Sequence, residues 1–141
     1  MALDLSSLKE AIGSLERALK VASTMIKGAI HTDQEHVVRA GVIQNFEFTY
    51  ELCWKFIQRW LSENQNPQEA QEPLTRKELF RTAARCGLIE DPENWFAYSA
   101  ARNISAHTYD NRAAEKVYAQ AQPLLKDAKH LLQKLQKTAD D

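Results

Sequence analysis

Apolar side chains recur at intervals of three and four residues along most of this chain. The first segment sets the pattern with the series Leu5, Leu8, Ile12, Leu15, Leu19, Ala22 and Ile26. This spacing places the apolar side chains on one face of an α-helix, whereas a half-buried β-strand alternates with a period of two. No segment keeps a period of two for long enough to form a strand. The sequence therefore predicts an all-α fold.

Breaks in the apolar pattern divide the chain into five expected helices. Gly28 and the polar residues after it indicate a turn, with Asp33 as the cap of the next helix. The proline-bearing stretch 63–73 has no periodicity and predicts a surface loop. The helices are expected to cover about residues 4–27, 34–63, 75–86, 92–107 and 111–137. A length of 141 residues indicates one domain, over residues 1–141.

Composition restricts the classes of function. The chain is 44% hydrophobic and 26% charged, with a formal net charge of -1, which is typical of a globular protein and argues against indiscriminate binding of polyanions. Nothing signals DNA binding, and any nucleic-acid contact must be local. The N-terminal segment lacks a continuous apolar core, so we expect a cytoplasmic protein with no membrane contact. Cys53 and Cys86 have no metal-binding spacing, and both are expected to be buried free thiols.

The segment 102–109 carries the most chemistry. Arg102, Asn103, His107 and Tyr109 bring a guanidinium, an amide, an imidazole and a phenol into eight residues, and such groups are costly to bury without partners. Arg102 and His107 would diverge by roughly 140° on a regular helix. For both to reach one ligand, the helix must end or distort near His107, or a second copy of the chain must complete the site across a dimer.

The helix that carries this segment has two adjacent stripes, and both are expected to continue buried faces. They consist of Trp95, Ser99, Arg102 and Ala106, and of Phe96, Ala100, Asn103 and His107. A purely structural interpretation also holds at this point. In it, Arg102, Asn103 and His107 satisfy one another and Glu47 in a polar core network.

The second helix is unusually aromatic in its middle, from Phe46 to Trp54, which predicts a central helix with neighbours on several sides. Glu47 and Glu51 lie one turn apart there. At least one of them could point inward toward Arg102. The alternative for Glu51 is a surface pair with Lys55 at i,i+4.

On the third helix, Lys77, Arg81 and Arg85 recur every four residues and form one basic face. Such a face is either solvated or lies beside an anionic ligand. The sequence alone leaves both alternatives open.

Three segments carry a resemblance to a known family. They are the run GVIQNFEFTYELCWK at 41–55, the segment 79–89, and Trp95 followed by R-N-x-x-x-H-x-Y at 102–109. With them the chain resembles the nucleotidyltransferase substrate-binding protein family, a branch of the HEPN superfamily. The resemblance spans most of the chain in the family's order.

The resemblance implies an up-and-down four-helix bundle with an additional short helix, similar to the C-terminal domain of kanamycin nucleotidyltransferase. Such proteins are usually homodimers, encoded beside a minimal nucleotidyltransferase in a two-component, toxin–antitoxin-like module. The chain would bind that partner and a nucleotide or substrate, without being a nucleotidyltransferase and without a cofactor or metal of its own. The supporting or substrate-binding positions would be Asn103, Glu47, Tyr50, Trp54 and Arg81.

Relatives with the same arginine–histidine motif are metal-independent endoribonuclease toxins, which a partner silences by adenylylating the following tyrosine. Carried over, Arg102 and His107 match the ribonuclease pair and Tyr109 matches the modified residue. A histidine can move the proton of an RNA 2′-hydroxyl, and an arginine can hold the phosphate. The resemblance therefore implies either a binding subunit or a ribonuclease.

Overall fold

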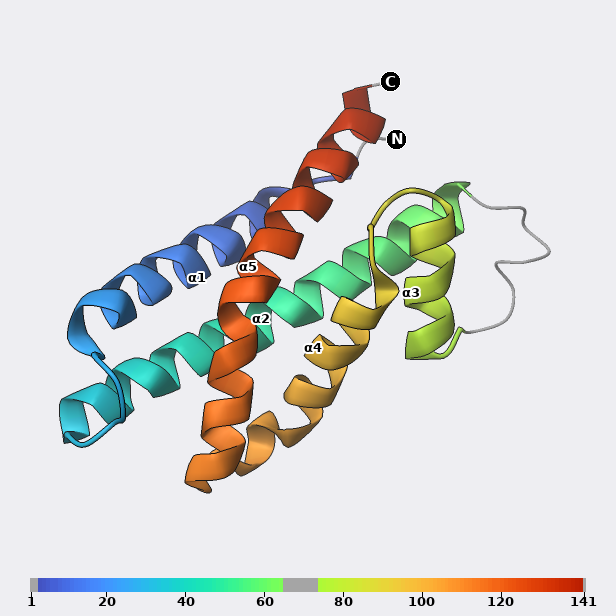
Figure 1. Ribbon diagram of the computed structural model, residues 1–141. Coiled ribbons are helices and arrows are strands. Elements are labelled where there is room, and N and C mark those ends of the chain that lie inside the picture. Colours follow the sequence, from blue (N-terminus) through green and yellow to red (C-terminus); the bar gives the residue numbers. More distant parts are fainter. Residues whose placement is uncertain (1–2, 65–73, 141) are drawn as a thin grey trace.

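The computed structural model describes residues 3–64 and 74–140, and every regular element within them is helical (Figure 1). The elements are α1 (Ser6–Met25), α2 (Asp33–Asn64), α3 (Arg76–Arg85), α4 (Pro92–Ile104), the 3-10 turn η1 (Ser105–His107) and α5 (Asn111–Asp140). The all-α prediction is confirmed, with α3 as the additional short helix. Most of the expected loop at 63–73 lies outside the described residues.

The second helix is the centre of the bundle. α2 contacts α1, α3, α4 and α5. It runs antiparallel to α1, and α5 crosses α1 and α2 (Figure 1). Its inward face contributes Phe46, Tyr50 and Ile57 to the core. Phe48 is the exception to the aromatic pattern, because its side chain is 56% exposed on the outer face. None of the described helices is long and apolar enough to cross a membrane.

The start of α2 differs from the prediction that Asp33 caps it. Thr32 Oγ1 accepts a hydrogen bond from the Glu35 amide at 3.1 Å, and the Glu35 carboxylate accepts one from the Thr32 amide at 2.9 Å. This reciprocal pair is a capping box, so Asp33 becomes the first helical residue instead of the cap. The backbone hydrogen bonds that the Glu35 carboxylate accepts from the amides of Thr32 and His31 lower the pKa of this carboxyl group.

The helix that carries the motif is started by local chemistry. The Asp91 side chain accepts a hydrogen bond from the Glu93 amide at 2.9 Å, and Pro92 occupies the first turn, where its missing N–H costs nothing. α3 begins in a related way, since Thr75 caps it and exchanges hydrogen bonds with Glu78. Caps at both starts fix where α3 and α4 can place their side chains on α2.

The two cysteines differ, and the prediction for one of them is wrong. Cys53 is buried on α2, and burial raises the pKa of its thiol. Cys86 is exposed at the C-terminal end of α3, where Gly87, with a φ of 79°, ends the helix before the chain returns to the core at Leu88 and Ile89.

Candidate functional site

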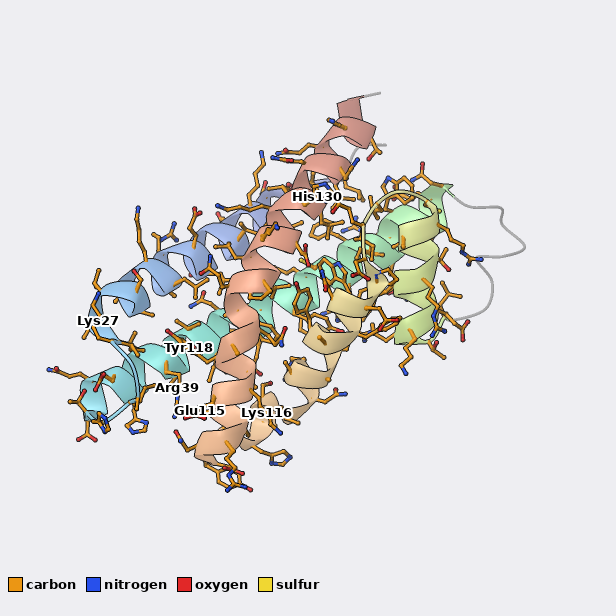
Figure 2. The ribbon with its side chains drawn as sticks, in the orientation of Figure 1. Lys27, Arg39, Glu115, Lys116, Tyr118 and His130 are labelled. Carbon is orange, nitrogen blue, oxygen red and sulfur yellow. The ribbon has the colours of Figure 1, made fainter. Side chains whose placement is uncertain are left out.

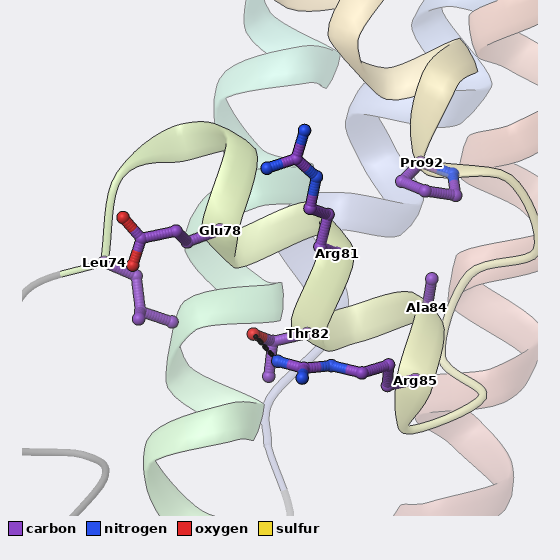
Figure 3. Close-up of a pocket in the computed structure, with 7 residues that line it drawn as sticks. All are labelled: Leu74, Glu78, Arg81, Thr82, Ala84, Arg85 and Pro92. Carbon is purple, nitrogen blue, oxygen red and sulfur yellow. Dashed lines mark hydrogen bonds between the residues drawn. The ribbon is translucent and has the colours of Figure 1, made fainter.

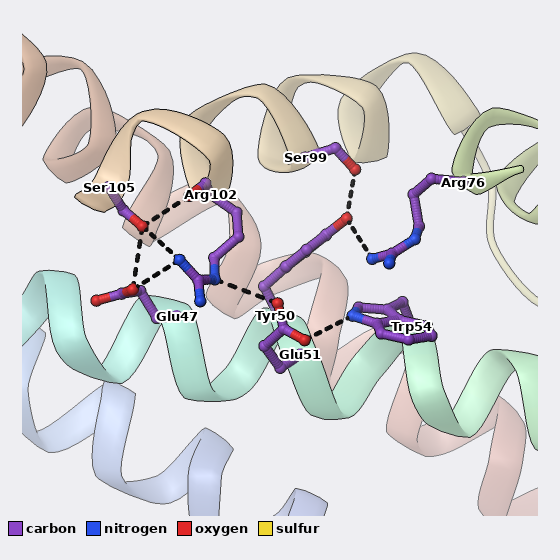
Figure 4. Close-up of polar contacts among 8 residues, drawn as sticks. All are labelled: Glu47, Tyr50, Glu51, Trp54, Arg76, Ser99, Arg102 and Ser105. Carbon is purple, nitrogen blue, oxygen red and sulfur yellow. Dashed lines mark hydrogen bonds and ion pairs between the residues drawn. The ribbon is translucent and has the colours of Figure 1, made fainter. Parts of the chain in front are cut away.

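Arg102 is held against α2 by two carboxylates. Its Nη1 lies 2.8 Å from Glu47 Oε2, and its Nε lies 3.2 Å from Glu51 Oε1 (Figure 4). Nη1 also donates to Ser105 Oγ at 2.9 Å. Both glutamates therefore lie beside the motif, and no ion pair joins Glu51 to Lys55 in the part of the chain described.

This cluster is only half-buried, and its charges do not cancel. About a third of each side chain is exposed: 33% for Arg102, 27% for Glu47 and 33% for Glu51. With one guanidinium between two carboxylates, the surroundings of Arg102 are net negative. An incoming phosphate would have to compete with the glutamates for the same donors.

The helix ends inside the motif, three residues earlier than the predicted bound of 107. α4 stops at Ile104, and the chain tightens into η1, which ends at His107. Ser105 is buried at this change, where its hydroxyl lies 2.7 Å from the Arg102 carbonyl and 3.1 Å from Glu47 Oε2. Arg102 and Ser105 therefore hold the end of α4 on α2.

His107 does not belong to the Arg102 cluster. Its side chain is exposed, and no described residue forms a hydrogen bond or ion pair with it. Its ring meets the ring of Tyr109 edge-on, with centroids 6.1 Å apart. Asn103 is also exposed. Of the hypothesis that Arg102, Asn103 and His107 satisfy one another and Glu47 in a polar core network, the Arg102–Glu47 contact is present, but the hypothesis is wrong for Asn103 and His107.

Tyr109 is the most accessible large side chain of the motif, with 89% of its surface exposed. It lies between η1 and α5, directly before Asp110, whose carboxylate accepts a hydrogen bond from the Arg112 amide at 2.9 Å. The phenol is thus displayed on a turn whose far side is anchored by the start of α5.

The outer face of α4 carries a row, Phe96, Ala100, Asn103 and His107, in which Phe96 is half-buried against the core and the other three residues are exposed. We call it the exposed row of α4. The expectation that this stripe is buried is wrong from Ala100 onward. The adjacent stripe is mixed: Trp95 is buried, Ser99 and Arg102 face α2, and the last residue, Ala106, is exposed. α4 therefore has one row on the surface and one row on α2.

The polar contacts of Arg102 continue along the seam between α2 and α4. Glu51 Oε2 accepts from Trp54 Nε1 at 2.9 Å, and the Arg76 guanidinium stacks on the Trp54 ring at 3.6 Å from its centroid. Arg76 also donates to the Tyr50 hydroxyl at 3.1 Å, and that hydroxyl hydrogen-bonds Ser99 (Figure 4). Tyr50 and Trp54, expected from the sequence, thus share a network with Arg102.

Arg81 lies apart from this network. Its guanidinium carbon is 5.3 Å from the Phe96 ring centroid, and Lys77 Nζ lies 5.8 Å from the same centroid. Arg85 turns instead to Thr82 Oγ1, at 3.1 Å. A hollow of about 490 Å³ opens beside Arg81 and Arg85 (Figure 3). The three cations of the basic face therefore do not converge on one point.

Sequence reasoning missed Arg39. This guanidinium is 5% exposed between α2 and α5, where it donates to Asn111 Oδ1 at 2.9 Å and lies 3.4 Å from His36 Nδ1 (Figure 2). It anchors the first residue of α5, two positions after Tyr109. The only signal was an arginine on the same helical face as Phe46, which is too weak to single it out.

Comparison with known proteins adds to this geometry. Residues 3–137 match the family described as "Nucleotidyltransferase substrate binding protein like". "Probable ribonuclease HepT" of Haemophilus influenzae is 42% identical over 96 residues, which cover 68% of this chain and 66% of that protein. The match thus spans slightly less than two thirds of that relative.

Solved structures give the same fold. A Haemophilus influenzae structure, described as revealing the fold of a substrate binding domain of a nucleotidyltransferase, has a TM-score of 0.84 and 35% identity, and the match covers 94% of this chain and 99% of that one. A Thermus thermophilus structure has a TM-score of 0.67 and 24% identity, covering 89% of this chain and 98% of that one. The second likeness concerns the fold alone.

Proposed function

This chain belongs to the nucleotidyltransferase substrate-binding protein family, and from that premise we propose that it is the helical subunit of a two-component module. In this module it binds a minimal nucleotidyltransferase and presents a substrate to it. The substrate is Tyr109 itself. Because the nucleotide donor is ATP, the module works in the cytoplasm.

The observation that carries this proposal is the exposure of Tyr109. At 89% exposed, the phenol is accessible to a second protein's active site without any unfolding of the turn. The contacts of Arg102 with α2 hold the end of α4 before Tyr109, and the Arg39–Asn111 hydrogen bond holds the start of α5 after it. A rigid support with a free acceptor group is what a transferase needs in a protein substrate.

The transfer balances simply. The Tyr109 hydroxyl oxygen attacks the α-phosphorus of ATP, a new P–O bond forms, and the α–β phosphoanhydride bond breaks. Pyrophosphate leaves, and a base in the partner takes up the phenolic proton. The product carries an added negative charge and a nucleoside beside His107, which would obstruct access of another anion to the motif.

Co-expression with a minimal nucleotidyltransferase from the same genome tests the proposal. We expect the two proteins to co-purify, and we expect mass spectrometry after incubation with ATP to find one or more AMP units on Tyr109. Tyr109→Phe is the matched control, since it removes only the acceptor oxygen and should leave the complex intact. A stable absence of both complex and adduct would contradict the proposal.

A second candidate function is RNA cleavage, favoured by the 42% identity to a protein named as a probable ribonuclease and by the exposure of His107. Here His107 removes the 2′-hydroxyl proton, and the 2′-oxygen attacks the adjacent phosphorus. The P–O5′ bond breaks, which gives a 2′,3′-cyclic phosphate and a 5′-hydroxyl once the leaving oxygen gains a proton. The Arg102 guanidinium gives up its contact with one glutamate and binds the phosphate instead. It then stabilises the negative charge of the phosphorane.

The cleaving unit is a homodimer in this proposal. Arg102 is turned toward α2 while His107 points to solvent, and no contact joins them within one chain. Residues that diverge in one copy can meet across a two-fold axis, because the same patch of both copies takes part in such an interface. The site then combines Arg102 of one copy with His107 of the other.

His107→Ala separates catalysis from structure. Because the side chain is exposed and has no described polar partner, its removal should change the free energy of unfolding by less than about 0.5 kcal/mol. RNA cleavage by the purified protein should be abolished. If folded wild-type protein cleaves none of several RNAs, the ribonuclease function is eliminated. The proposed role as the substrate of a nucleotidyltransferase would be unaffected.

A further inference from the structure

The exposed row of α4 connects the motif to the basic face of α3. The half-buried Phe96 lies near one end of α4, and the exposed His107 closes η1 at the other. The eleven residue steps between them correspond to about 16 Å along a helix. Between them lie only the methyl group of Ala100 and the amide of Asn103, so no bulky side chain of the row interrupts this path.

Two cations stand at the Phe96 end of the row. Lys77 Nζ and the Arg81 guanidinium carbon lie 5.8 Å and 5.3 Å from the Phe96 ring centroid. We call Lys77 and Arg81 the α3 cation pair. Both side chains are exposed, and no ion pair to a described carboxylate occupies either of them. The ring holds both charges at the surface at the same end of the row.

We propose that the α3 cation pair is a distal phosphate subsite for single-stranded RNA, whose backbone runs along the exposed row of α4 toward His107. The inference rests on the ribonuclease candidate above and names where its substrate binds away from the cleaved bond. The scissile phosphate lies at the His107 end, and a phosphate a few nucleotides along the strand lies on Lys77 and Arg81. This local basic site suits a chain whose net charge is only -1.

An RNA strand fits this face better than a protein partner does. Protein interfaces have an apolar core with aromatic or aliphatic anchors. The large apolar side chains exposed among the described residues are Val21, Met25, Val37, Phe48 and Tyr109, and none of them lies on α3 or α4. α3 instead carries four cations and one carboxylate in ten residues. Charge without an apolar core is the character of a phosphate-binding face.

Binding of short oligonucleotides of two lengths tests the subsite. The probes are labelled, unstructured RNAs of two and eight nucleotides, with 2′-O-methyl groups that prevent cleavage. Only the longer probe can span from His107 to the cation pair. In Lys77→Gln/Arg81→Gln, we expect weaker binding of the longer probe and a salt dependence of log K that is shallower by about 0.7, since the one phosphate held by the pair contributes about 0.7 on single strands. Binding of the shorter probe should be unchanged.

Two matched variants complete the design. Arg81→Lys keeps the charge and should keep the salt dependence, while Arg17→Gln/Lys20→Gln removes two exposed cations from α1, which packs on α2 and α5, and should change nothing. Circular dichroism must show all variants folded.

Each remaining outcome is decisive. An unchanged salt dependence in the double variant overturns the subsite but leaves the ribonuclease in place. Two other results for the double variant would also overturn the subsite and leave the ribonuclease in place. One is an equal loss of affinity for both probes. The other is loss of binding to the nucleotidyltransferase partner while RNA binding stays intact. If wild-type protein binds neither probe, the ribonuclease candidate fails and the subsite fails with it.

Discussion

At the scale of single residues, the position of Arg102 between two carboxylates determines how the motif can meet an anion. Its donors already serve Glu47 and Glu51, at 2.8 Å and 3.2 Å. A phosphate must therefore displace at least one glutamate, and the net negative surroundings oppose its approach. The glutamates hold the guanidinium in place and lower the affinity of the site at the same time.

Glu47→Gln separates these two effects. The amide oxygen can still accept from Arg102, but one negative charge is removed, so affinity for the eight-nucleotide probe should rise. Because the pair is about one-third exposed, the free energy of unfolding should fall by no more than about 1 kcal/mol. Fluorescence titration and urea denaturation measure the two quantities. Glu10→Gln, an exposed position on α1, is the control, and equal or weaker RNA binding by Glu47→Gln would show that the carboxylate does not compete.

The sequence predicts part of the Arg102 network and misses part of it for a physical reason. Helical periodicity places Glu47, Tyr50 and Trp54 along one side of α2, so a common partner for them is predictable. Arg76 and Ser99 complete the same network from other helices. Their contacts depend on how α3 and α4 rotate and cross against α2, and residue spacing within one helix does not encode that rotation.

At the scale of elements, α4 is joined to α5 by a buried tyrosine. The Tyr98 hydroxyl donates to Asp127 Oδ2, and its ring lies edge-on to Trp95 in the core. Burial, with the hydrogen bond to Asp127 and the charge of that carboxylate, raises the pKa of Tyr98. The phenol therefore stays protonated in the folded protein at pH values where an unfolded tyrosine ionises.

This shift fixes a direction for the alkaline stability of the protein. A folded pKa above the unfolded value of about 10 means that the stabilisation is complete below pH 10 and declines as pH rises beyond it. In Tyr98→Phe, the free energy of unfolding should fall less steeply above pH 10 than in the wild type. At neutral pH it should be lower by about 1–3 kcal/mol, because a hydrogen bond to a charged group is lost. Urea denaturation between pH 8 and 11 measures both effects. Tyr118→Phe is the comparison, because burial also raises the pKa of Tyr118, and a larger flattening there than in Tyr98→Phe would contradict the assignment.

Element boundaries show where local chemistry competes. Thr32 and Asp33 are both residue types that favour the N-cap position, so the sequence does not show which of them caps α2. In the structure, the hydrogen bonds between Thr32 and Glu35 make Thr32 the cap. The end of α4 is harder still. Ser105 can continue a helix, but its hydroxyl contacts Glu47 on α2, and this long-range contact accompanies the tightening into η1.

At the scale of the whole molecule, the single chain leaves its candidate catalytic groups apart. Arg102 faces the seam with α2, while His107 and Tyr109 face solvent beyond the end of α4. Phe48 is exposed on α2 one residue after Glu47, so an apolar side chain lies next in sequence to a member of the Arg102 cluster. In the ribonuclease proposal, a second copy of the chain would have to bring these groups together.

Mixing two inactive variants tests this arrangement directly. Arg102→Ala and His107→Ala should each abolish RNA cleavage as homodimers. After denaturation and refolding of an equal mixture, about half of the dimers combine one chain of each kind, as expected for random pairing within a two-fold dimer. If each site takes Arg102 from one copy and His107 from the other, one of the two sites in these mixed dimers is intact, so the mixture should recover about a quarter of wild-type activity. If each site instead lay within a single chain, the mixture would recover no activity. A mixture that sediments as dimers but stays inactive would therefore refute the shared site.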